Sequence, residues 1–375
     1  MDKQALLSLI ALQHIPGIGS ITAKRLLESI GSATLIFEHR TELPLMSTQI
    51  QPSLVKALDC PAAHRRAEQE LEFIDKHHIT CIGYNDEAYP SRLRECVDAP
   101  ILLFYRGNAT LNPHRVVSIV GTRKCTEYGR DLCDRFVRDL AFQHPDVLIV
   151  SGLAYGIDIC AHRAAIKYGL PTVGVLAHGL DRIYPSVHRN TAIQMATCGG
   201  ILTEYLSQTE PERQNFLQRN RIIAGISDAT IIIESADKGG ALVTANIANS
   251  YNRGCYTFPG RVGDTYSSGC HRLIRNNQAS LITSATDFIE SMLWDIPQHN
   301  DSNAVQGILF PQLNDEENTI VQLLKQHADG LPINTIAIET GLPVHRTSAT
   351  LFELELRDIV RVLAGNTYKL CMPIP

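Results

Sequence analysis

A glycine turn that ends in an arginine could hold phosphate groups. The turn Gly121-Thr122-Arg123 comes directly after the apolar segment Val116–Val120, and a helical pattern starts near Thr126. Backbone N–H groups at the start of a helix attract anions, and an arginine adds a bidentate charge-assisted contact. The turn matches neither the GxGxxG fingerprint of dinucleotide-binding proteins nor the GxxxxGK(S/T) loop of ATP-binding proteins. We therefore expect it to bind the phosphates of a different ligand.

Three further segments carry candidate phosphate contacts near apolar strands and helices. These contacts are Ser151 and Gly152, then Arg219, Asn220 and Arg221, and finally Lys238, Gly239 and Gly240. The carboxyl ends of parallel strands lie on one edge of a sheet, where open α/β folds bind their ligands. We expect all four segments to meet on that edge. For the two arginines, an ion pair within the chain is the competing explanation.

Aromatic and basic residues could extend such a site along a nucleic acid. Phe216 and Tyr155 are candidates for stacking on bases. A stretch from residue 253 to 275 contains one acidic residue and four arginines, Arg253, Arg261, Arg272 and Arg275. We expect this stretch to lengthen the phosphate-binding edge, and an ordinary solvated face is the alternative.

The residues that could support catalysis or metal binding do not form a recognisable site. Asp158 and His162 are four residues apart and could form an acid/base pair on one helical face, but a helix cap is the simpler function for Asp158. The ten cysteines include no CxxC pair and no nearby CxxH pair, which excludes the usual zinc spacings. We expect reduced thiols, and no catalytic residue, metal or cofactor.

Composition limits how a phosphate site could arise. The chain has 375 residues, of which 44% are hydrophobic and 19% are charged, and its formal net charge is -5. This length predicts two or three globular domains. Because the net charge is negative, any attraction for nucleic acid must come from a local cationic patch.

Short apolar strands alternate with helical patterns in the centre of the chain, which predicts parallel strands covered by helices on both faces. We expect an α/β fold: an extended Rossmann-like domain with a parallel or mixed sheet, a small α-helical N-terminal module and a C-terminal winged-helix-like domain. The expected bounds are 1–60 for a helix-hairpin-helix or SAM-like module, 61–295 for the Rossmann-like domain, 296–313 for a linker and 314–375 for the winged-helix-like domain.

The two terminal modules leave their roles open. The N-terminal hairpin, Pro16-Gly17-Ile18-Gly19, could present N–H groups to DNA near Lys24 and Arg25, or it could serve packing alone. The C-terminal module has five Lys or Arg residues and eight Asp or Glu residues between positions 314 and 370. This acidic balance favours contact with a protein over reading of a DNA groove.

The N-terminus lacks a cationic segment followed by an apolar one, and no apolar run approaches the roughly 20 residues that span a bilayer. We expect a cytoplasmic protein without membrane contact.

The central segments resemble the DprA/Smf family of bacterial DNA-processing proteins. The resemblance rests on Ser118–Arg123, Ser151–Asp158, Gly179-Leu180-Asp181 with Tyr184-Pro185, Arg219–Gly225 and Phe258-Pro259-Gly260. It implies a dimeric single-stranded DNA-binding protein that protects incoming DNA and loads the RecA recombinase during natural transformation. It also implies phosphate-holding roles for the four segments above. The family pattern has Asn where His188 and His271 stand, which leaves the roles of these two histidines open.

Two other functions remain as hypotheses. Rossmann-like nucleotide-processing hydrolases have similar phosphate loops, but their Pro-Gly-Gly-x-Gly-Thr pattern is missing, since Gly239-Gly240 is followed by Ala241-Leu242. The chain could also act mainly as an adaptor that docks partners on its acidic C-terminal module.

Overall fold

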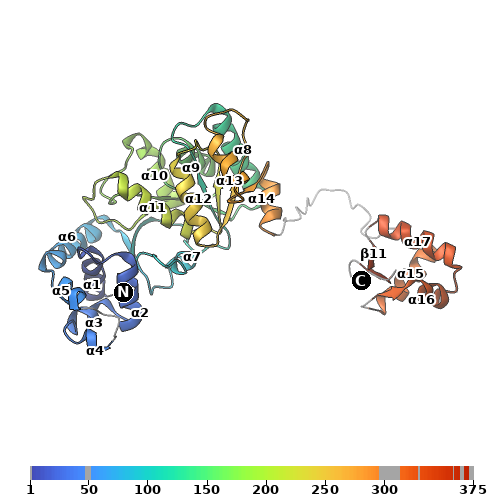
Figure 1. Ribbon diagram of the computed structural model, residues 1–375, viewed down its shortest axis with the longest axis horizontal. Coiled ribbons are helices and arrows are strands. Elements are labelled where there is room, and N and C mark those ends of the chain that lie inside the picture. The colour runs from blue at the N-terminus through green and yellow to red at the C-terminus, as the bar shows by residue number, and fades with distance from the viewer. Residues whose placement is uncertain are drawn as a thin grey trace. The chain divides into compact units, whose positions relative to one another are not determined.

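The computed structural model describes residues 2–46, 52–294, 313–327, 330–357, 359–363 and 367–370. They belong to two compact units, Met1–Pro297 and Gln298–Pro375, and each is described by itself (Figure 1). The expected linker 296–313 lies outside the described residues except for Leu313, and the expected turn at Gly365-Asn366 lies outside them as well. No helix in the described part is long and apolar enough to cross a membrane.

The first unit is built on a nine-stranded mixed sheet with the order β1-β2-β6-β5-β4-β3-β7-β8-β9. From β6 to β9 in this order each strand runs parallel to the next, whereas β1 pairs antiparallel with β2, and β2 pairs antiparallel with β6. The predicted α/β fold with a parallel or mixed sheet is confirmed. The strands are β1 (Thr80–Gly83), β2 (Leu102–Gly107), β3 (Val116–Val120), β4 (Leu148–Ser151), β5 (Thr172–Val175), β6 (Gly199–Thr203), β7 (Ala229–Ile232), β8 (Gly254–Thr257) and β9 (Ser280–Leu281).

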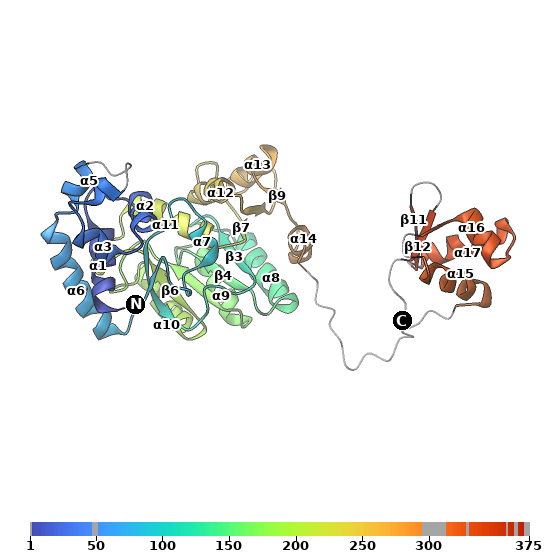
Figure 2. The same ribbon diagram turned by 90° about the horizontal axis from the view of Figure 1, so that it is seen from below.

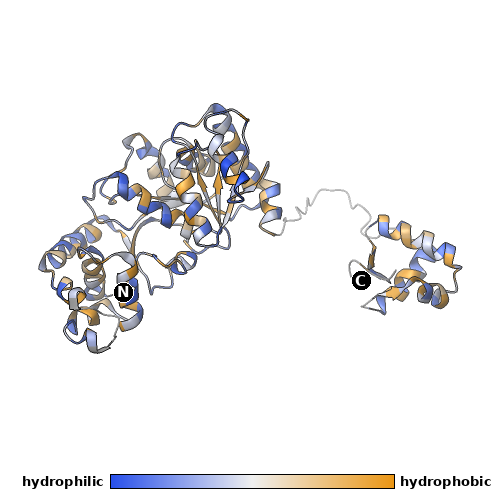
Figure 3. Ribbon diagram, viewed as in Figure 1, coloured by the Kyte–Doolittle hydropathy of each residue, from blue (hydrophilic) through white to orange (hydrophobic). Residues whose placement is uncertain are grey.

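Helices cover both faces of the sheet because the central strands are apolar on both sides. Alternate residues of a strand point to opposite faces. Val117 and Ile119 of β3 therefore pack in a core with α8, α9 and α14, whereas Val116 and Val120 pack in a core with α11, α12 and α13. Figure 2 shows α8 and α9 on one side of β3 and β4 and α11 and α12 on the other, and Figure 3 shows the hydrophobic strands between them. These helices are α8 (Glu127–Gln143), α9 (Ile157–Lys167), α11 (Arg213–Gly225), α12 (Gly240–Ser250), α13 (Ser268–Arg275) and α14 (Ala285–Ser291).

The N-terminal helices share the core of the sheet unit. Buried residues of α1, α2 and α6 belong to the same hydrophobic cluster as Leu102, Phe104 and Val116. The remaining helices of this unit are α1 (Lys3–His14), α2 (Ser20–Ile30), α3 (Ala33–Glu38), α4 (Leu43–Met46), α5 (Pro52–Ala57), α6 (Pro61–His77), α7 (Ser91–Arg94), α10 (Arg189–Cys198) and the short 3-10 helix η1 (Ser186–His188).

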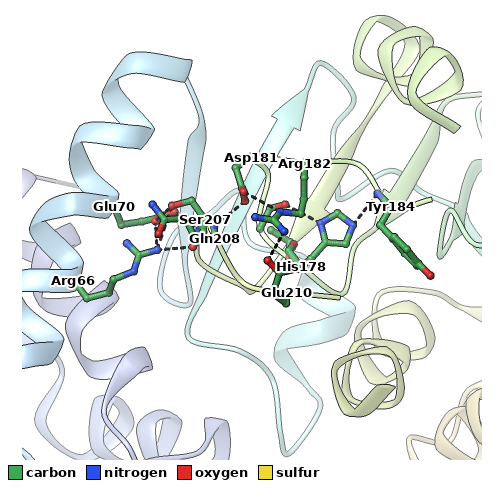
Figure 4. Close-up of polar contacts among 11 residues, drawn as sticks. Arg66, Glu70, His178, Asp181, Arg182, Tyr184, Ser207, Gln208 and Glu210 are labelled. Atoms are coloured by element: carbon green, nitrogen blue, oxygen red, sulfur yellow. Dashed lines mark hydrogen bonds and ion pairs between the residues drawn. The ribbon is translucent and has the colours of Figure 1, made fainter. Parts of the chain in front are cut away.

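A buried polar contact ties α6 to the loop that follows β6. The Glu70 carboxylate is 2% exposed and accepts hydrogen bonds from the backbone N–H and the hydroxyl of Ser207 at 2.9 and 2.5 Å. Arg66 donates to the same carboxylate at 2.9 Å and to the Ser207 carbonyl at 2.6 Å (Figure 4). This loop leads directly into α11, so α6 supports the start of that helix.

The second unit has the helix order and the small sheet of a winged-helix domain. Its three-stranded sheet has the order β10-β12-β11. Asn314 and Glu317 form a capping box that starts α15. The elements are α15 (Asp315–Lys325), β10 (Leu331–Pro332), α16 (Ile333–Thr340), α17 (Val344–Leu356), β11 (Val360–Leu363) and β12 (Thr367–Leu370).

Candidate nucleic-acid interface

The order of the strands reverses at β3, which fixes the place of a ligand site. Strand β3 pairs with β4 on one side and with β7 on the other. The connections from β3 and β7 leave in opposite directions from such a point, which opens a crevice at the carboxyl edge. The predicted turn Gly121-Thr122-Arg123 and the predicted loop Lys238-Gly239-Gly240 follow these two strands.

Backbone hydrogen bonds hold the three loops of this edge together. The Thr122 N–H donates to the Glu234 carbonyl at 2.8 Å, and the Ile157 N–H donates to the Thr122 carbonyl at 3.2 Å. Gly156 has a φ of 78° and leaves no space for a Cβ, because the Thr122 carbonyl stands there. The position therefore requires glycine for both backbone conformation and close approach.

The Glu234 side chain fixes the start of α8. Its carboxylate accepts hydrogen bonds from the backbone N–H of Thr126 at 2.9 Å and from the Thr126 hydroxyl at 2.5 Å. The same hydroxyl accepts from the Gly129 N–H at 3.0 Å and caps the helix. The residues between Gly121 and Thr126 are thus held at both ends.

These loops and one face of α11 line a cavity of about 750 Å³. The cavity brings together nine of the predicted site residues, namely Gly121, Thr122, Arg123, Phe216, Arg219, Asn220, Lys238, Gly239 and Gly240. Its wall also includes Asp158, Arg213 and Thr244. The sequence did not lead us to expect Arg213 or Thr244 at this site.

Three exposed cations surround this cavity. Arg123, Arg213 and Lys238 are exposed and make no ion pair within the described part of the chain. The Arg123 guanidinium lies 5.0 Å from the centre of the Phe216 ring, which holds it by a cation–π contact. The result is a local positive patch on a chain whose net charge is -5.

Two aromatic rings stand beside the patch. The ring centres of Phe216 and Tyr184 are 5.9 Å apart, and Tyr184 is 45% exposed. Tyr184 follows β5 in a loop where its N–H donates to His178, and Asp181 of the same loop accepts from the Gln208 N–H (Figure 4). Sequence reasoning used Tyr184 only as part of the family motif and did not expect it beside Phe216.

Arg219 lies in the floor of the cavity and serves the protein itself. Its side chain is buried, and its guanidinium donates to the Gly152 carbonyl at 2.6 Å and to the Val175 carbonyl. Burial lowers the pKa of Arg219 to about 10, and the carboxylate of Asp158 opposes this shift. Burial likewise raises the pKa of Asp158, against the attraction of Arg219. The two side chains thus stabilise each other below the cavity.

Arg221 does not reach the cavity, so the expectation that it joins this edge is corrected. It forms an ion pair with Glu204 and donates to the Asp98 carbonyl at 2.5 Å. Burial lowers the pKa of Arg221, but the carboxylates of Glu204 and Asp98 outweigh this cost and raise it. Residues two apart on a helix point about 200° apart, so Arg219 and Arg221 face opposite sides of α11. The competing explanation, an ion pair within the chain, is correct for Arg221.

Two further predicted contacts lie behind the cavity wall. The Ser151 hydroxyl is buried and donates to the Ile119 carbonyl at 2.6 Å. Gly152 leaves no space for a Cβ because the Arg219 guanidinium packs there. Neither residue lines the cavity. Tyr155 is 47% exposed, but it packs edge-on against His188 instead of Phe216.

The basic stretch divides between two edges of the sheet. Arg253 precedes β8, and it donates to the Glu95 carboxylate at 2.7 Å and to the Arg92 carbonyl at 2.8 Å. It lies at the amino edge, so the expectation that it extends the phosphate-binding edge is corrected. Arg272 lies near the loop after β7, where it pairs with Asp237 at 3.2 Å. Arg261 and Arg275 are exposed.

The N-terminal hairpin uses one of its cations for packing. Lys24 donates to the carbonyls of Arg94 and Cys96 at 3.2 and 2.9 Å, and its ammonium lies 5.3 Å from the Tyr84 ring centre. Arg25 is exposed. The contacts of Lys24 favour the packing role for this hairpin.

The buried histidines have structural partners. His162 shares a hydrogen bond of 2.7 Å with the Thr172 hydroxyl, and His188 shares one of 2.8 Å with the Leu153 carbonyl. Burial lowers the pKa of His162 to about 3. The neutral imidazole of His162 is bonded to Thr172, and the Asp158 carboxyl is held by Arg219. The two side chains are therefore not arranged as an acid/base pair. Within the described residues no cluster of metal-binding side chains is present.

Comparisons with known proteins match both units. The family model of DNA recombination-mediator protein A covers residues 80–293, and the model of the DprA winged helix domain covers residues 310–366. Protein Smf of Synechocystis sp. is 33% identical over 398 residues, which cover 96% of this chain and 97% of that protein. DNA processing protein DprA of Streptococcus pneumoniae is 37% identical over 204 residues, which cover 54% of this chain and 71% of that protein.

Two solved structures share the fold at 30% sequence identity. DprA from Streptococcus pneumoniae superposes with a TM-score of 0.58 and covers 73% of this chain and 98% of that chain. The second structure is that of DNA processing protein A from Helicobacter pylori, which was determined to describe its single-stranded DNA binding mode. It superposes with a TM-score of 0.52, and the match covers 57% of this chain and 95% of that chain. The predicted resemblance and the predicted winged-helix domain are confirmed.

Replacement of His162 by glutamine tests its neutral, buried state. In the folded chain the pKa of His162 is lowered from 6.5 to about 3, so the unfolded chain takes up a proton first as the pH falls. The contribution of neutral His162 to the free energy of unfolding is therefore fully present above pH 6.5, and it is lost progressively as the pH falls toward 3. Between pH 7.5 and 5.5 this linkage amounts to about 1.4 kcal/mol. Urea unfolding should show a smaller pH dependence for His162→Gln by that amount. Equal pH dependence in both proteins would contradict the assignment, and the exposed His114→Gln is the control.

Proposed function

The chain belongs to the DprA/Smf family of DNA recombination-mediator proteins, and on this premise we propose that it binds single-stranded DNA. The strand lies across the cavity between β3, β7 and α11. The observation that carries the proposal is the cluster of three unpaired cations, Arg123, Arg213 and Lys238, beside two glycine loops. The single-stranded DNA binding of the Helicobacter pylori relative supports it.

The proposed contacts follow from what each group offers. The backbone N–H group of Gly240 at the start of α12 is suited to a phosphate oxygen, whereas the N–H groups of Thr122 and Gly239 donate to carbonyls within the chain. The three cations neutralise phosphates, and the Asn220 amide adds a neutral hydrogen bond. Tyr184 and Phe216 offer ring faces on which bases stack without sequence preference.

Binding accounts for the site better than catalysis does. Asp158, the one carboxyl of the cavity wall, is buried and held by Arg219, and His162 is bonded to Thr172. Neither group is placed to activate a water molecule. We therefore propose a binding protein in preference to a nucleotide hydrolase.

The biological role extends this proposal to partners. We propose that the chain acts as a homodimer in the cytoplasm, where it protects incoming DNA and loads the RecA recombinase during natural transformation. Support comes from the family membership. The acidic second unit, with eight acidic and five basic residues between positions 314 and 370, is suited to contact a protein surface.

Replacement of Arg123 by alanine tests the DNA site. The loss of one charged phosphate contact costs about 1.4 to 3 kcal/mol, so the Kd for an oligonucleotide should rise at least about tenfold. The plot of log affinity against log salt should become shallower by about 0.7. Fluorescence anisotropy with single-stranded DNA measures both values. The exposed Arg138 of α8 gives the matched control Arg138→Ala, and equal affinity of the two variants would refute the site.

Incubation with nucleotides tests the hydrolase alternative. The purified chain should release no free base or phosphate from a panel of nucleoside monophosphates, because no general base is positioned in the cavity. Chromatography of the products is the measurement. Release that disappears in Asp158→Asn, with the fold intact by circular dichroism, would establish an enzyme instead.

Removal of the second unit tests its separate role. A chain that ends at Asn303 keeps every residue of the proposed DNA site, so its affinity for single-stranded DNA should stay within about twofold, near the 0.5 kcal/mol expected of changes remote from a site. Binding of RecA to immobilised protein should weaken. Parallel loss of both activities would show that the roles are not separable.

A further inference from the structure

Two cysteine thiols meet directly behind the proposed DNA site. Cys125 lies two residues after Arg123, immediately before the cap of α8, and Cys160 lies in the first turn of α9. Their side chains are electrostatic neighbours where α8 and α9 begin. Both residues are partly exposed and pack against the same hydrophobic core.

The backbone brings these two segments together independently of the thiols. The Ile157 N–H donates to the Thr122 carbonyl at 3.2 Å, and Gly156 packs so closely on the backbone of Arg123 that a Cβ has no space. Helices α8 and α9 then run side by side from these two ends (Figure 2). The proximity of the two segments that carry the thiols is therefore a feature of the fold.

The surroundings make the two thiols unequal. Cys125 stands at the amino end of α8, a helix of 17 residues, and its sulfur lies 3.8 Å from a guanidinium nitrogen of Arg130. Both groups place positive potential at the sulfur, which is the setting of reactive protein thiols. Burial and the neighbouring Cys125 raise the pKa of Cys160 to about 12, so Cys160 stays a thiol until its partner has reacted.

We propose that Cys125 and Cys160 form a redox modification site that takes a peroxide as oxidant and closes into a disulfide. The Cys125 sulfur attacks one oxygen of the peroxide, so an S–O bond forms, the O–O bond breaks, and the leaving oxygen departs as water with the thiol proton. The Cys160 sulfur then attacks the sulfenic sulfur of Cys125, and the S–O bond breaks with loss of a second water. Two thiols are oxidised by two electrons in total, and one hydrogen peroxide is reduced to two waters.

The disulfide changes the position of the phosphate-binding turn. It holds two sulfurs about 2 Å apart, closer than any two thiols that are not covalently bonded, so one segment must move. Cys160 is fixed in α9, whereas Cys125 lies in the loop between β3 and α8. The movement therefore draws the loop after Arg123 toward α9 and away from its contact with Phe216. This effect on DNA binding rests on the proposed function, whereas the disulfide itself does not.

The experiment oxidises the reduced full chain with stoichiometric hydrogen peroxide and maps peptides by mass spectrometry. A peptide that links Cys125 to Cys160 should form in the wild type and in the control Cys198→Ser, whose thiol lies at the end of α10. The link should be absent from Cys125→Ser and from Cys160→Ser. Amide hydrogen exchange at 122–126 should change on oxidation only where the link forms. A link to the fully buried Cys133, or oxidation of Cys125 to sulfinic acid without a link, would overturn the proposal.

Titrations of the same samples with single-stranded DNA measure how the disulfide changes DNA affinity. The linked wild type should bind about tenfold more weakly, as expected for loss of one charged contact, and a thiol reductant should restore the affinity. A linked chain with unchanged exchange and unchanged affinity would refute the effect on the turn. If the reduced wild type did not bind DNA, the proposed function would fail, and the linked peptide with the exchange data would still decide the redox site.

Discussion

The backbone of Thr122 is held from both sides, and the rest of the binding edge depends on this constraint. Its N–H is bonded to the loop after β7 and its carbonyl to the first turn of α9. A residue whose backbone N–H and carbonyl are both hydrogen-bonded to neighbouring segments cannot shift without losing hydrogen bonds. In the reduced chain the turn therefore keeps one conformation, and Arg123 and Cys125, which follow Thr122, take their positions from it.

Local patterns in the sequence predicted the elements because the deciding interactions are local. The limits of β3, of α2 and of α16 follow from apolar periodicity between clear start and stop signals, such as Gly19 before α2 and Gly341 after α16. The strand order could not be read in the same way. Pairing of β2 with β6 joins residues about a hundred positions apart, and no feature of either strand alone names its partner.

The residues that line the cavity were predicted more completely in the loops than on helix α11. Gly121, Arg123 and Lys238 follow strands whose ends must meet. One face of α11 carries four residues that line the cavity, namely Arg213, Phe216, Arg219 and Asn220. Arg221 points to the other side of the helix. Sequence reasoning assigned both arginines of this helical segment to the same edge, and so it missed both Arg213 and the opposite orientation of Arg221. The ion pair of Arg221 with Glu204 joins residues that only the tertiary fold brings together.

In the proposed binding mode, the small number of free cations in the cavity limits how tightly one copy of the chain holds a long strand. Three cations neutralise roughly three phosphates, which is few beside the 6–10 phosphate contacts of a tight nucleic-acid complex. In this mode a single copy would dissociate easily at physiological salt. In the proposed homodimer, two cavities on one strand would add their binding free energies through a high effective concentration, and this avidity would compensate for the weak binding of each cavity. Weak individual sites of this kind also let each copy leave the strand stepwise when another protein takes its place.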